Sequence, residues 1–207
     1  ANGIIALGLR EDDRLIRVTL TDGNSQMLVA SYNGKVVRFP EDTVRPMGRT
    51  ATGVRAIKLD EDGKDRVIGM ICVEQGSKDS VLVISEKGFG KRTLLDDENG
   101  EPIYRITNRG GKGVKTMNIT DKTGNLIGLE AVNDDMDLML ITKAGTAIRM
   151  AMDAISVLGR ATQGVKLIEL QKRNDTLMFG CTVPKEEQEE VAESEEVTTE
   201  ETTTTEE

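Results

Sequence analysis

The sequence has no histidine and no tryptophan, and only two tyrosines and three phenylalanines among its 207 residues. Without histidine, the chain lacks the side chain that most often acts as a general base or binds a metal ion. The absence of tryptophan and histidine excludes a typical WD40 array, and so few aromatic rings cannot build a base-stacking platform for single-stranded nucleic acid. No P-loop and no nucleophile elbow is present either. We therefore expect no catalytic site in this chain.

Cysteines and long apolar runs are also scarce. The two cysteines, Cys72 and Cys181, do not have a metal-binding spacing, and two cysteines do not make a disulfide framework. We interpret both as small hydrophobic side chains in a reducing cytoplasm. The sequence contains no signal peptide and no run of about 18 apolar residues, so it gives no indication of secretion by that route or of a membrane span.

What the sequence does contain is a unit that recurs three times. Each unit has an apolar strand that ends in a glycine turn, an arginine four residues later, and then a basic turn of the form [Gly/Asn]-Arg-x-x-x-Gly-Val. The strand and glycine turn occupy 27–34, 81–88 and 138–145, and the basic turn occupies 48–54, 108–114 and 159–165. Repeats of this length are typical of stacked or radially arranged β-units.

The pattern of short apolar runs predicts an all-β fold. Runs such as 27–31, 35–39, 54–59 and 66–73 indicate about four strands per unit. Four strands in roughly 40–60 residues fit a propeller-like blade, and a full ring needs about 4–8 blades. The chain begins inside a unit and shows no N-terminal cap. We therefore expect an incomplete ring of four-stranded blades whose N-terminal blades are missing, within a longer protein.

This interpretation divides the chain into a repeat body, residues 1–184, and a tail, residues 185–207. The body has a partial blade at 1–25 and repeats at about 26–79, 80–136 and 137–184. The tail contains eleven glutamates, one lysine and no aromatic residue, so we expect it to be disordered. It either keeps the protein soluble or folds over basic residues of the body and competes with an anionic ligand.

Charge in the body is segregated by position within the repeat. The windows 34–58, 87–115 and 143–166 hold 17 Lys and Arg residues but only 7 Asp and Glu residues. Basic residues at one place in every blade would form a stripe on one rim, which is typical of binding to a nucleic-acid backbone. Alternatively, arginines beside tight turns solvate the surface or bond turn carbonyls. The recurrence in three units favours DNA binding, and the few aromatic residues favour double-stranded DNA.

The candidate DNA-binding residues are Lys35, Arg38, Arg49, Arg55, Lys91, Arg92, Arg109, Lys112, Lys115, Lys143, Arg149, Arg160 and Lys166. The turn glycines that accompany them are Gly34, Gly53, Gly88, Gly110, Gly111, Gly113, Gly145 and Gly164.

The sharpest local motif is Arg109-Gly110-Gly111-Lys112-Gly113. Its glycines would let backbone N–H groups approach a phosphate, and its Arg and Lys would neutralise that phosphate. The same glycines could equally mark a turn that needs a positive φ angle.

Together these motifs resemble the C-terminal domain of the DNA gyrase A protein, of the type IIA topoisomerase family, in its last blades. The resemblance covers essentially residues 1–183. It rests on Arg-Phe-Pro at 38–40, Gly-Arg-x-x-x-Gly-Val-Arg at 48–55, Ser-Glu-Lys-Gly-Phe-Gly-Lys-Arg at 85–92, Arg-Gly-Gly-Lys-Gly at 109–113 and Gly-Arg-Ala-Thr-Gln-Gly-Val at 159–165.

The resemblance implies a β-pinwheel, a propeller-like ring of six blades that exchange strands with their neighbours and wrap duplex DNA around a basic perimeter. The family's signature box, Gln-Arg-Arg-Gly-Gly-Lys-Gly, belongs to a first blade upstream of this chain. Residues 107–113 are a degenerate copy with Thr107-Asn108 in place of Gln-Arg. For these residues the resemblance implies only contact with phosphates.

The resemblance also implies a role in a larger enzyme. The holoenzyme introduces negative supercoils with ATP and Mg²⁺, while its catalytic tyrosine and its ATPase lie outside this chain, which itself needs no cofactor. The implied partners are double-stranded DNA with weak sequence preference, and the gyrase B protein and a second gyrase A protein (A2B2) through regions absent here. A small-molecule ligand and a membrane are not implied, and the location is the bacterial cytoplasm, at the nucleoid.

Two alternatives remain open at the level of sequence. One is the C-terminal domain of the topoisomerase IV protein that is related to gyrase A and shares its blades. The other is a propeller that serves only as a protein-interaction platform, similar to chromosome-condensation-regulator repeats.

Overall fold

The structure is a computed structural model, and it describes residues 3–61, 63–170 and 175–185. These residues form eleven strands and two single-turn 3-10 helices, so the expected all-β fold is confirmed. The elements in chain order are β1 Gln26–Ser31, β2 Lys35–Pro40, η1 Glu41–Thr43, β3 Val67–Val73, β4 Ser80–Ser85, β5 Phe89–Leu94, β6 Val114–Lys115, β7 Leu126–Val132, β8 Met136–Thr142, β9 Ala147–Ala151, η2 Met152–Ala154, β10 Val165–Lys166 and β11 Leu177–Pro184.

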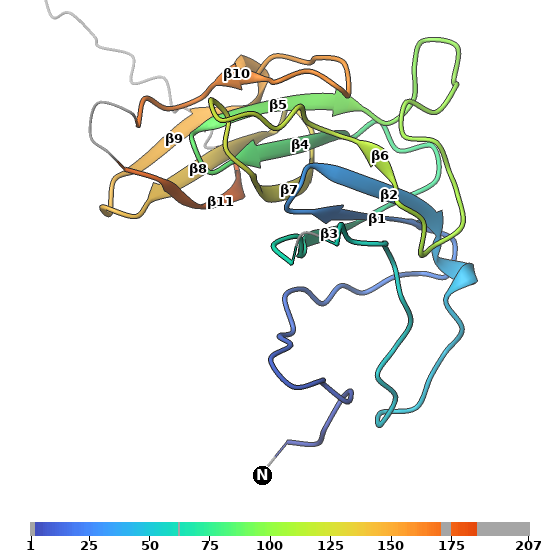
Figure 1. Cartoon of the computed structure of the whole chain (residues 1–207). Helices are drawn as coiled ribbons and strands as arrows, with labels where there is room; N and C mark the ends of the chain where they lie inside the picture. The colour runs from blue at the N-terminus through green and yellow to red at the C-terminus, as the bar shows by residue number, and fades with distance from the viewer. Residues whose placement is uncertain (1–2, 62, 171–174, 186–207) are drawn as a thin grey trace, which may run out of the picture.

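The strands form three antiparallel sheets that follow one another along the chain (Figure 1). Sheet 1 has the order β3-β1-β2-β6, sheet 2 the order β10-β5-β4-β7, and sheet 3 the order β11-β8-β9. A hairpin lies at the centre of sheets 1 and 2, and the third strand of the same repeat, β3 or β7, pairs with the first strand of that hairpin.

The fourth strand of sheets 1 and 2 comes from the next repeat. β6 follows the hairpin β4–β5 in the chain but pairs with β2 of sheet 1, where Val114 lies opposite Val36. In the same way β10 follows β8–β9 but pairs with β5 of sheet 2. Strands are therefore exchanged between neighbouring blades, which is the defining feature of the pinwheel implied by the resemblance.

The glycine of the basic turn makes this exchange possible. Gly113 precedes β6 with φ of +70°, and a Cβ atom there would overlap the carbonyl oxygen of Val36. Gly164 precedes β10 with φ of +78°, and a Cβ atom there would lie 2.7 Å from the carbonyl oxygen of Gly90. Only glycine allows both the left-handed backbone and this close approach of two main chains. The turn glycine is thus a structural requirement of strand exchange.

The core lies between successive sheets. One buried cluster joins Leu28 and Ile71 of sheet 1 to Val83 and Leu126 of sheet 2, and a second joins sheet 2 to sheet 3. The continuous apolar runs 81–84 and 138–141 lie within β4 and β8. All six residues of β4 are buried, since that strand is covered from both sides.

The two cysteines are half-buried and free, so they do not form a disulfide with each other. Cys72 packs against the apolar cluster of Met27, Val29 and Phe39 on sheet 1. For Cys72 this agrees with the interpretation as a small hydrophobic side chain.

The prediction of a strand at residues 54–59 was wrong. Residues 54–59 form no strand, and they lie in a long connection between β2 and β3 that projects from the sheets beside the N-terminal segment (Figure 1). This stretch corresponds to β6 and β10, which pair with the hairpin of the preceding sheet. Sheet 1 is the first sheet of the described residues, so residues 54–59 have no such hairpin beside them.

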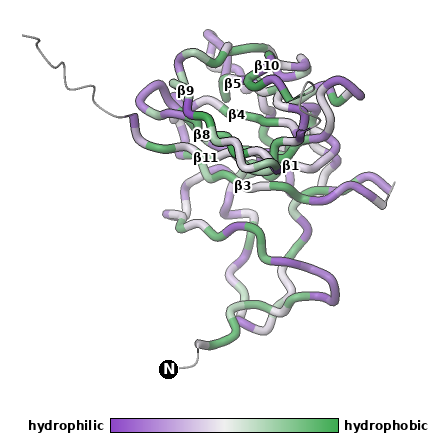
Figure 2. Tube along the Cα trace, turned by 90° about the vertical axis from the view of Figure 1, so that its left-hand side faces the viewer, coloured by the Kyte–Doolittle hydropathy of each residue, from purple (hydrophilic) through white to green (hydrophobic). Residues whose placement is uncertain are grey.

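The N-terminal segment, residues 3–24, likewise contains no strand. Its apolar side chains are exposed, with Ile4 at 76% and Leu20 at 97%. Figure 2 shows hydrophobic stretches along this segment as well as along the strands of the body. The segment contacts the rest of the protein through an ion pair of 3.3 Å between Arg17 and Glu130 and through a hydrogen bond of 3.1 Å from the Gly8 N–H to the Ala51 carbonyl oxygen. The acidic tail predicted at 185–207 lies outside the described residues, apart from Lys185.

Replacing Gly113 with alanine tests the requirement for glycine at the strand exchange. We expect Gly113→Ala to lower the free energy of unfolding by on the order of 3 kcal/mol, because the left-handed backbone and the overlap with Val36 both cost energy. Urea denaturation monitored by circular dichroism measures this loss.

Gly53→Ala is the matched control. Gly53 holds the same place in the first repeat with φ of +82°, but no atom lies within 4 Å of the added Cβ. Its expected loss is about 1 kcal/mol, from the backbone conformation alone. Equal losses in the two variants would contradict the role assigned to strand exchange.

Candidate nucleic-acid interface

Strand exchange carries basic residues onto the outer edge of the sheets. β6 and β10 are edge strands of sheets 1 and 2, and each brings a lysine, Lys115 and Lys166. The basic turns that lead into these strands bring Arg109, Lys112 and Arg160. We call these five residues, together with Arg55, the edge row.

Hydrogen bonds from arginine side chains to main-chain carbonyl groups link the edge row from one repeat to the next. Nη1 of Arg109 donates to the Arg55 carbonyl oxygen at 3.4 Å, and Nη1 of Arg160 donates to the Lys115 carbonyl oxygen at 2.8 Å. Each basic turn therefore lies directly against the basic segment of the preceding repeat. The tertiary structure brings cations that are about fifty residues apart in sequence into one continuous set.

The charges of the edge row are accessible. Arg55, Lys112, Lys115 and Lys166 are exposed, and Arg109 and Arg160 are partly exposed. Lys166 forms an ion pair of 2.6 Å with Glu169. Exposed pairs of this kind contribute little to stability, so a phosphate can compete for the lysine.

Three of the predicted DNA-binding residues are buried, and the structure contradicts that role for them. Arg38 is 4% exposed, Arg92 is 7% exposed and Lys91 is fully buried. A buried cation whose donors are occupied cannot contact a phosphate on the surface without unfolding its surroundings. In these three cases the alternative, that cations near turns bond carbonyl groups, is correct.

Arg38 connects sheet 1 to the second repeat. Its Nε donates to Oε1 of Gln26 at 2.6 Å, and its Nη1 forms an ion pair with Asp96 at 2.9 Å. The same Nη1 donates to the carbonyl oxygens of Leu95 and Tyr104, both at 3.2 Å. Through these charge-assisted hydrogen bonds to buried carbonyl groups, Arg38 holds the first and second blades together.

Arg92 repeats this arrangement between the second and third repeats. Its Nε donates to the Ile155 carbonyl oxygen at 2.9 Å, and its Nη1 pairs with Asp134. Arg149, the third member of the series, instead bonds within its own sheet, to Asp137 at 2.7 Å and to the Pro184 carbonyl oxygen at 2.9 Å. In the first two repeats this arginine therefore serves blade packing.

Lys91 holds the basic turn of the third repeat. Its Nζ donates to the carbonyl oxygens of Gly159 at 2.5 Å and Arg160 at 2.7 Å, and to Oγ1 of Thr162 at 3.0 Å. Burial, with a smaller contribution from the Arg160 guanidinium, lowers the pKa of Lys91 to about 8.

The remaining predicted cations lie outside the edge row. Lys35 is half-buried and pairs with Asp60 at 2.5 Å, although it lies opposite Lys115 across the β2–β6 pair. Arg49 is exposed on the long connection, and Lys143 is exposed in the turn after β8. These residues extend the basic surface without joining the linked set.

The turn glycines mainly serve the backbone. All of them except Gly111 have a positive φ angle. In the sharpest motif, the Gly110 N–H donates to the Ala56 carbonyl oxygen at 2.6 Å, and the Gly111 carbonyl accepts from the Lys58 N–H at 2.8 Å. The Gly110 N–H is thus not available to a phosphate, and the motif offers Arg109 and Lys112 instead.

Sequence reasoning did not select two further exposed cations, Arg105 and Lys122. Arg105 lines a small cavity of about 160 Å³ beside β2, together with Lys112 of the edge row. Lys122 lies with its Nζ 5.5 Å from the centre of the Phe89 ring, on the side of sheet 2 that also carries Lys166. Both residues fall outside the recurring motif, so only the general excess of basic residues around Arg105 pointed towards this surface.

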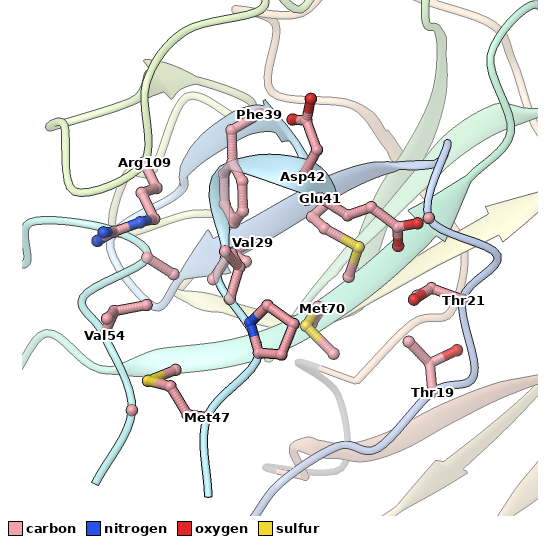
Figure 3. Close-up of a pocket in the computed structure, with 16 residues that line it drawn as sticks. Thr19, Thr21, Val29, Phe39, Glu41, Asp42, Met47, Val54, Met70 and Arg109 are labelled. Carbon is pink, nitrogen blue, oxygen red and sulfur yellow. The ribbon is translucent and has the colours of Figure 1, made fainter. Parts of the chain in front are cut away.

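An apolar groove lies between the N-terminal segment and sheet 1 (Figure 3). It has a volume of about 640 Å³, and Met27, Val29, Phe39 and Met70 form its wall. Arg109 lies at one edge, with its guanidinium turned away from the middle of the groove (Figure 3). Polar side chains of Thr19, Thr21, Glu41 and Asp42 line other parts of the groove (Figure 3).

Within the part of the chain that the structure describes, no three His, Cys, Asp or Glu side chains gather as a metal site. None of the helices among the described residues has the length and apolar character needed to cross a lipid bilayer.

The chain matches the model of the family described as DNA gyrase C-terminal domain, beta-propeller, over residues 1–22, 26–74, 79–133 and 137–179. It is also 48% identical, over 169 residues, to the DNA gyrase A proteins of two strains of Staphylococcus aureus, MRSA252 and NCTC 8325 / PS 47. The chain belongs to the DNA gyrase A C-terminal domain family. The alignment covers 82% of this chain and 18% of each relative, so the chain spans less than a fifth of their length.

Solved structures of gyrase and topoisomerase IV domains share this fold. The structure of a DNA gyrase A C-terminal domain aligns with a TM-score of 0.74 at 24% identity, covering 87% of this chain and 58% of that one. The C-terminal domain of DNA topoisomerase IV aligns with a TM-score of 0.77 at 20% identity, covering 86% and 53%. At these identities the likeness concerns the fold, and the gyrase assignment rests on the sequence match.

The buried arginine of this gyrase-family domain can be tested against an exposed one. We expect Arg38→Met to lower the free energy of unfolding by on the order of 3 kcal/mol, because it leaves Gln26 and two buried carbonyl groups without their donor. Arg49→Met, which alters an exposed arginine of the same repeat, should stay within about 0.5 kcal/mol of the wild type. Urea denaturation distinguishes the two, and an equally small loss for Arg38→Met would refute its role in holding the blades together.

The lowered pKa of Lys91 makes stability depend on pH. The folded-state pKa of about 8 lies below the ordinary lysine pKa of 10.5, so between these pH values unfolding takes up a proton. The free energy of unfolding should therefore rise with pH in this window, by on the order of 2 kcal/mol between about pH 7.5 and 9.5. Urea denaturation of the wild type and of Lys91→Met at both pH values measures the difference, and parallel changes in the two proteins would exclude Lys91 as the cause.

Proposed function

We propose that this chain is the DNA-binding and DNA-wrapping part of a DNA gyrase A protein. The observation that carries the proposal is the edge row, in which strand exchange joins accessible cations of successive repeats along the outer edge of the sheets. Membership of the gyrase A C-terminal domain family supports the same conclusion. This fragment itself catalyses no reaction.

The chemistry of the edge row favours the backbone of a duplex. Lysine and arginine side chains neutralise phosphates and release condensed counterions, so the affinity should fall steeply with salt. Contacts with phosphates position DNA without reading its sequence, so the preference for sequence should be weak. The scarcity of aromatic residues disfavours single strands, which proteins bind by stacking their bases.

A row of cations that runs from one blade to the next can also bend the DNA. Bending a duplex by 40–90° over 20–30 base pairs costs on the order of 1–6 kcal/mol. Several phosphate contacts along the edge of the sheets can offset this cost. The path of the DNA would then follow the succession of blades and have a fixed hand.

In the complete protein, such a wrap would present a second DNA segment to a distant catalytic region. The proposed outcome is the introduction of negative supercoils by an ATP- and Mg²⁺-dependent enzyme, assembled with the gyrase B protein and a second gyrase A protein in the bacterial cytoplasm. The catalytic tyrosine and the ATPase belong to regions beyond this chain. A topoisomerase IV domain would bind DNA through the same fold, but the 48% identity to gyrase A favours gyrase.

The test uses residues 1–184 and a non-specific duplex at several salt concentrations. We expect the logarithm of the association constant to fall linearly with the logarithm of the salt concentration, with a slope of roughly −3.6 to −5.4 if four to six cations contact phosphates. The double variant Lys112→Gln/Lys115→Gln should reduce the magnitude of the slope by about 2. Lys78→Gln, which removes an exposed lysine outside the basic windows, is the control and should leave the slope unchanged.

Wrapping is measured on a nicked, relaxed plasmid that is ligated in the presence of the protein and then deproteinised. A linking-number shift that grows with protein concentration is the expected result. Binding without a shift would mean that these blades bind DNA but do not set the hand of the wrap. An absence of binding at low salt would instead support the protein-interaction platform.

A further inference from the structure

Lys91 occupies a position that is apolar in the other two repeats. It lies three residues after the hairpin glycine, where the first repeat has Val37 and the third has Ile148, and both of these pack into apolar clusters. Lys91 is nevertheless fully buried. A charged side chain at a core position is costly unless its donors are satisfied, so its partners identify what it does there.

All three partners lie on one turn of the next repeat. The Lys91 Nζ binds the carbonyl oxygens of Gly159 and Arg160 and Oγ1 of Thr162, at 2.5, 2.7 and 3.0 Å. The turn is closed by the Thr162 N–H, which donates to the Gly159 carbonyl oxygen at 3.2 Å. Lys91 thus draws two successive carbonyl groups towards the interior.

The N–H groups of the same peptides must point the other way. The described residues contain no cis peptide bond, and in a trans peptide the C=O and N–H bonds have opposite directions. The N–H groups of Arg160 and Ala161 are therefore directed away from Lys91. Ala161 is exposed, and neither N–H donates to a backbone carbonyl within the described part of the chain.

The turn is also fixed in place from a second side. The Arg160 Nη1 donates to the Lys115 carbonyl oxygen at 2.8 Å, and the Asn118 N–H donates to the Thr162 carbonyl oxygen at 3.0 Å. Arginine has five N–H donors, so the Arg160 guanidinium keeps donors that the Lys115 carbonyl does not use. Backbone N–H groups with no carbonyl partner, and a guanidinium with donors to spare, are the groups that bind anions in proteins.

The corresponding turn of the second repeat does not have this arrangement. Val37 cannot bind its carbonyl groups, and the Gly110 N–H there donates to the Ala56 carbonyl oxygen at 2.6 Å. The Gly110 N–H is thus used inside the protein in the second repeat, whereas the equivalent Ala161 N–H in the third repeat donates to no backbone carbonyl of the described residues. The buried lysine accounts for the difference.

We propose that Lys91 is a positioning residue, which holds the Gly159–Thr162 turn so that the Arg160 and Ala161 N–H groups and the Arg160 guanidinium bind one phosphodiester group of a DNA duplex. This inference rests on the proposed DNA-binding function and adds to it a defined contact point at the junction of the second and third blades. Lys91 itself does not touch the DNA.

The experiment is a titration of the ¹⁵N-labelled full chain with a short non-specific duplex, monitored through its amide resonances. We expect the Arg160 and Ala161 amide resonances to shift on binding, and the Gly110 amide, whose donor is occupied, to serve as the internal comparison. In Lys91→Met the shifts of Arg160 and Ala161 should be lost. The dissociation constant should rise about three- to tenfold, and the magnitude of the salt slope should fall by about 1.

Two further variants separate positioning from a general structural effect. Ile148→Met places the same side chain at the matching site of the third repeat and should leave DNA affinity unchanged. The double variant Lys91→Met/Arg160→Met should bind no more weakly than Lys91→Met, because loss of the turn already removes the Arg160 contact. Effects that multiply in the double variant would overturn the proposal.

The outcomes distinguish this inference from the function on which it rests. No binding by the wild-type chain would overturn the proposed function itself. Binding with unshifted Arg160 and Ala161 amides would overturn only the role of the turn, and so would a folded Lys91→Met protein with wild-type affinity. If Lys91→Met does not fold, the wild-type amide titration alone decides.

Discussion

The structure depends on one constraint, which is that the outer strand of the first and of the second hairpin finds its hydrogen-bond partner in the next repeat. β2 pairs with β6 and β5 pairs with β10, so sheets 1 and 2 cannot be completed by the residues of a single repeat. The close main-chain approach at Gly113 and Gly164 follows from this pairing. So does the position of the basic turns, since each turn must cross the blade junction to reach its strand. Blade packing and the location of surface charge are thus consequences of the same exchange.

Arginine and lysine have two separate uses in this framework. Arg38 and Arg92 bind carbonyl groups of the following repeat and hold blades together, while Arg55 and Lys112 remain on the surface. The difference arises from where the strand places each side chain. A residue in the middle of a hairpin strand faces the neighbouring blade, whereas a residue in the turn before an exchanged strand faces solvent. Both the buried and the exposed cations recur in the sequence, so recurrence alone does not distinguish them.

The exposed cations matter as a group because the basic segments of successive repeats lie next to one another. Single surface lysines are weak binding sites, but contacts such as that of Arg160 with the Lys115 carbonyl join the basic segments of successive repeats. A polyanion with regularly spaced charges can then contact several cations at once. The entropy lost when the two molecules associate is then offset by several contacts and not by one. Lys91 adds a more local effect, because a buried charge orients the backbone of the turn that carries Arg160.

The sequence by itself determined the all-β fold, the repeats and the family, because apolar strand patterns and glycine turns are local features with direct physical meaning. It also located the basic turns, which the structure brings to the edge of the sheets. The strand predicted at 54–59 was wrong because pairing depends on a neighbouring hairpin, which no local pattern reveals. Likewise, only the tertiary structure showed that Arg38, Lys91 and Arg92 are buried and bonded to the next repeat. Whether a cation faces solvent or carbonyl groups is decided by the chain that packs against it, and that chain lies some fifty to seventy residues away.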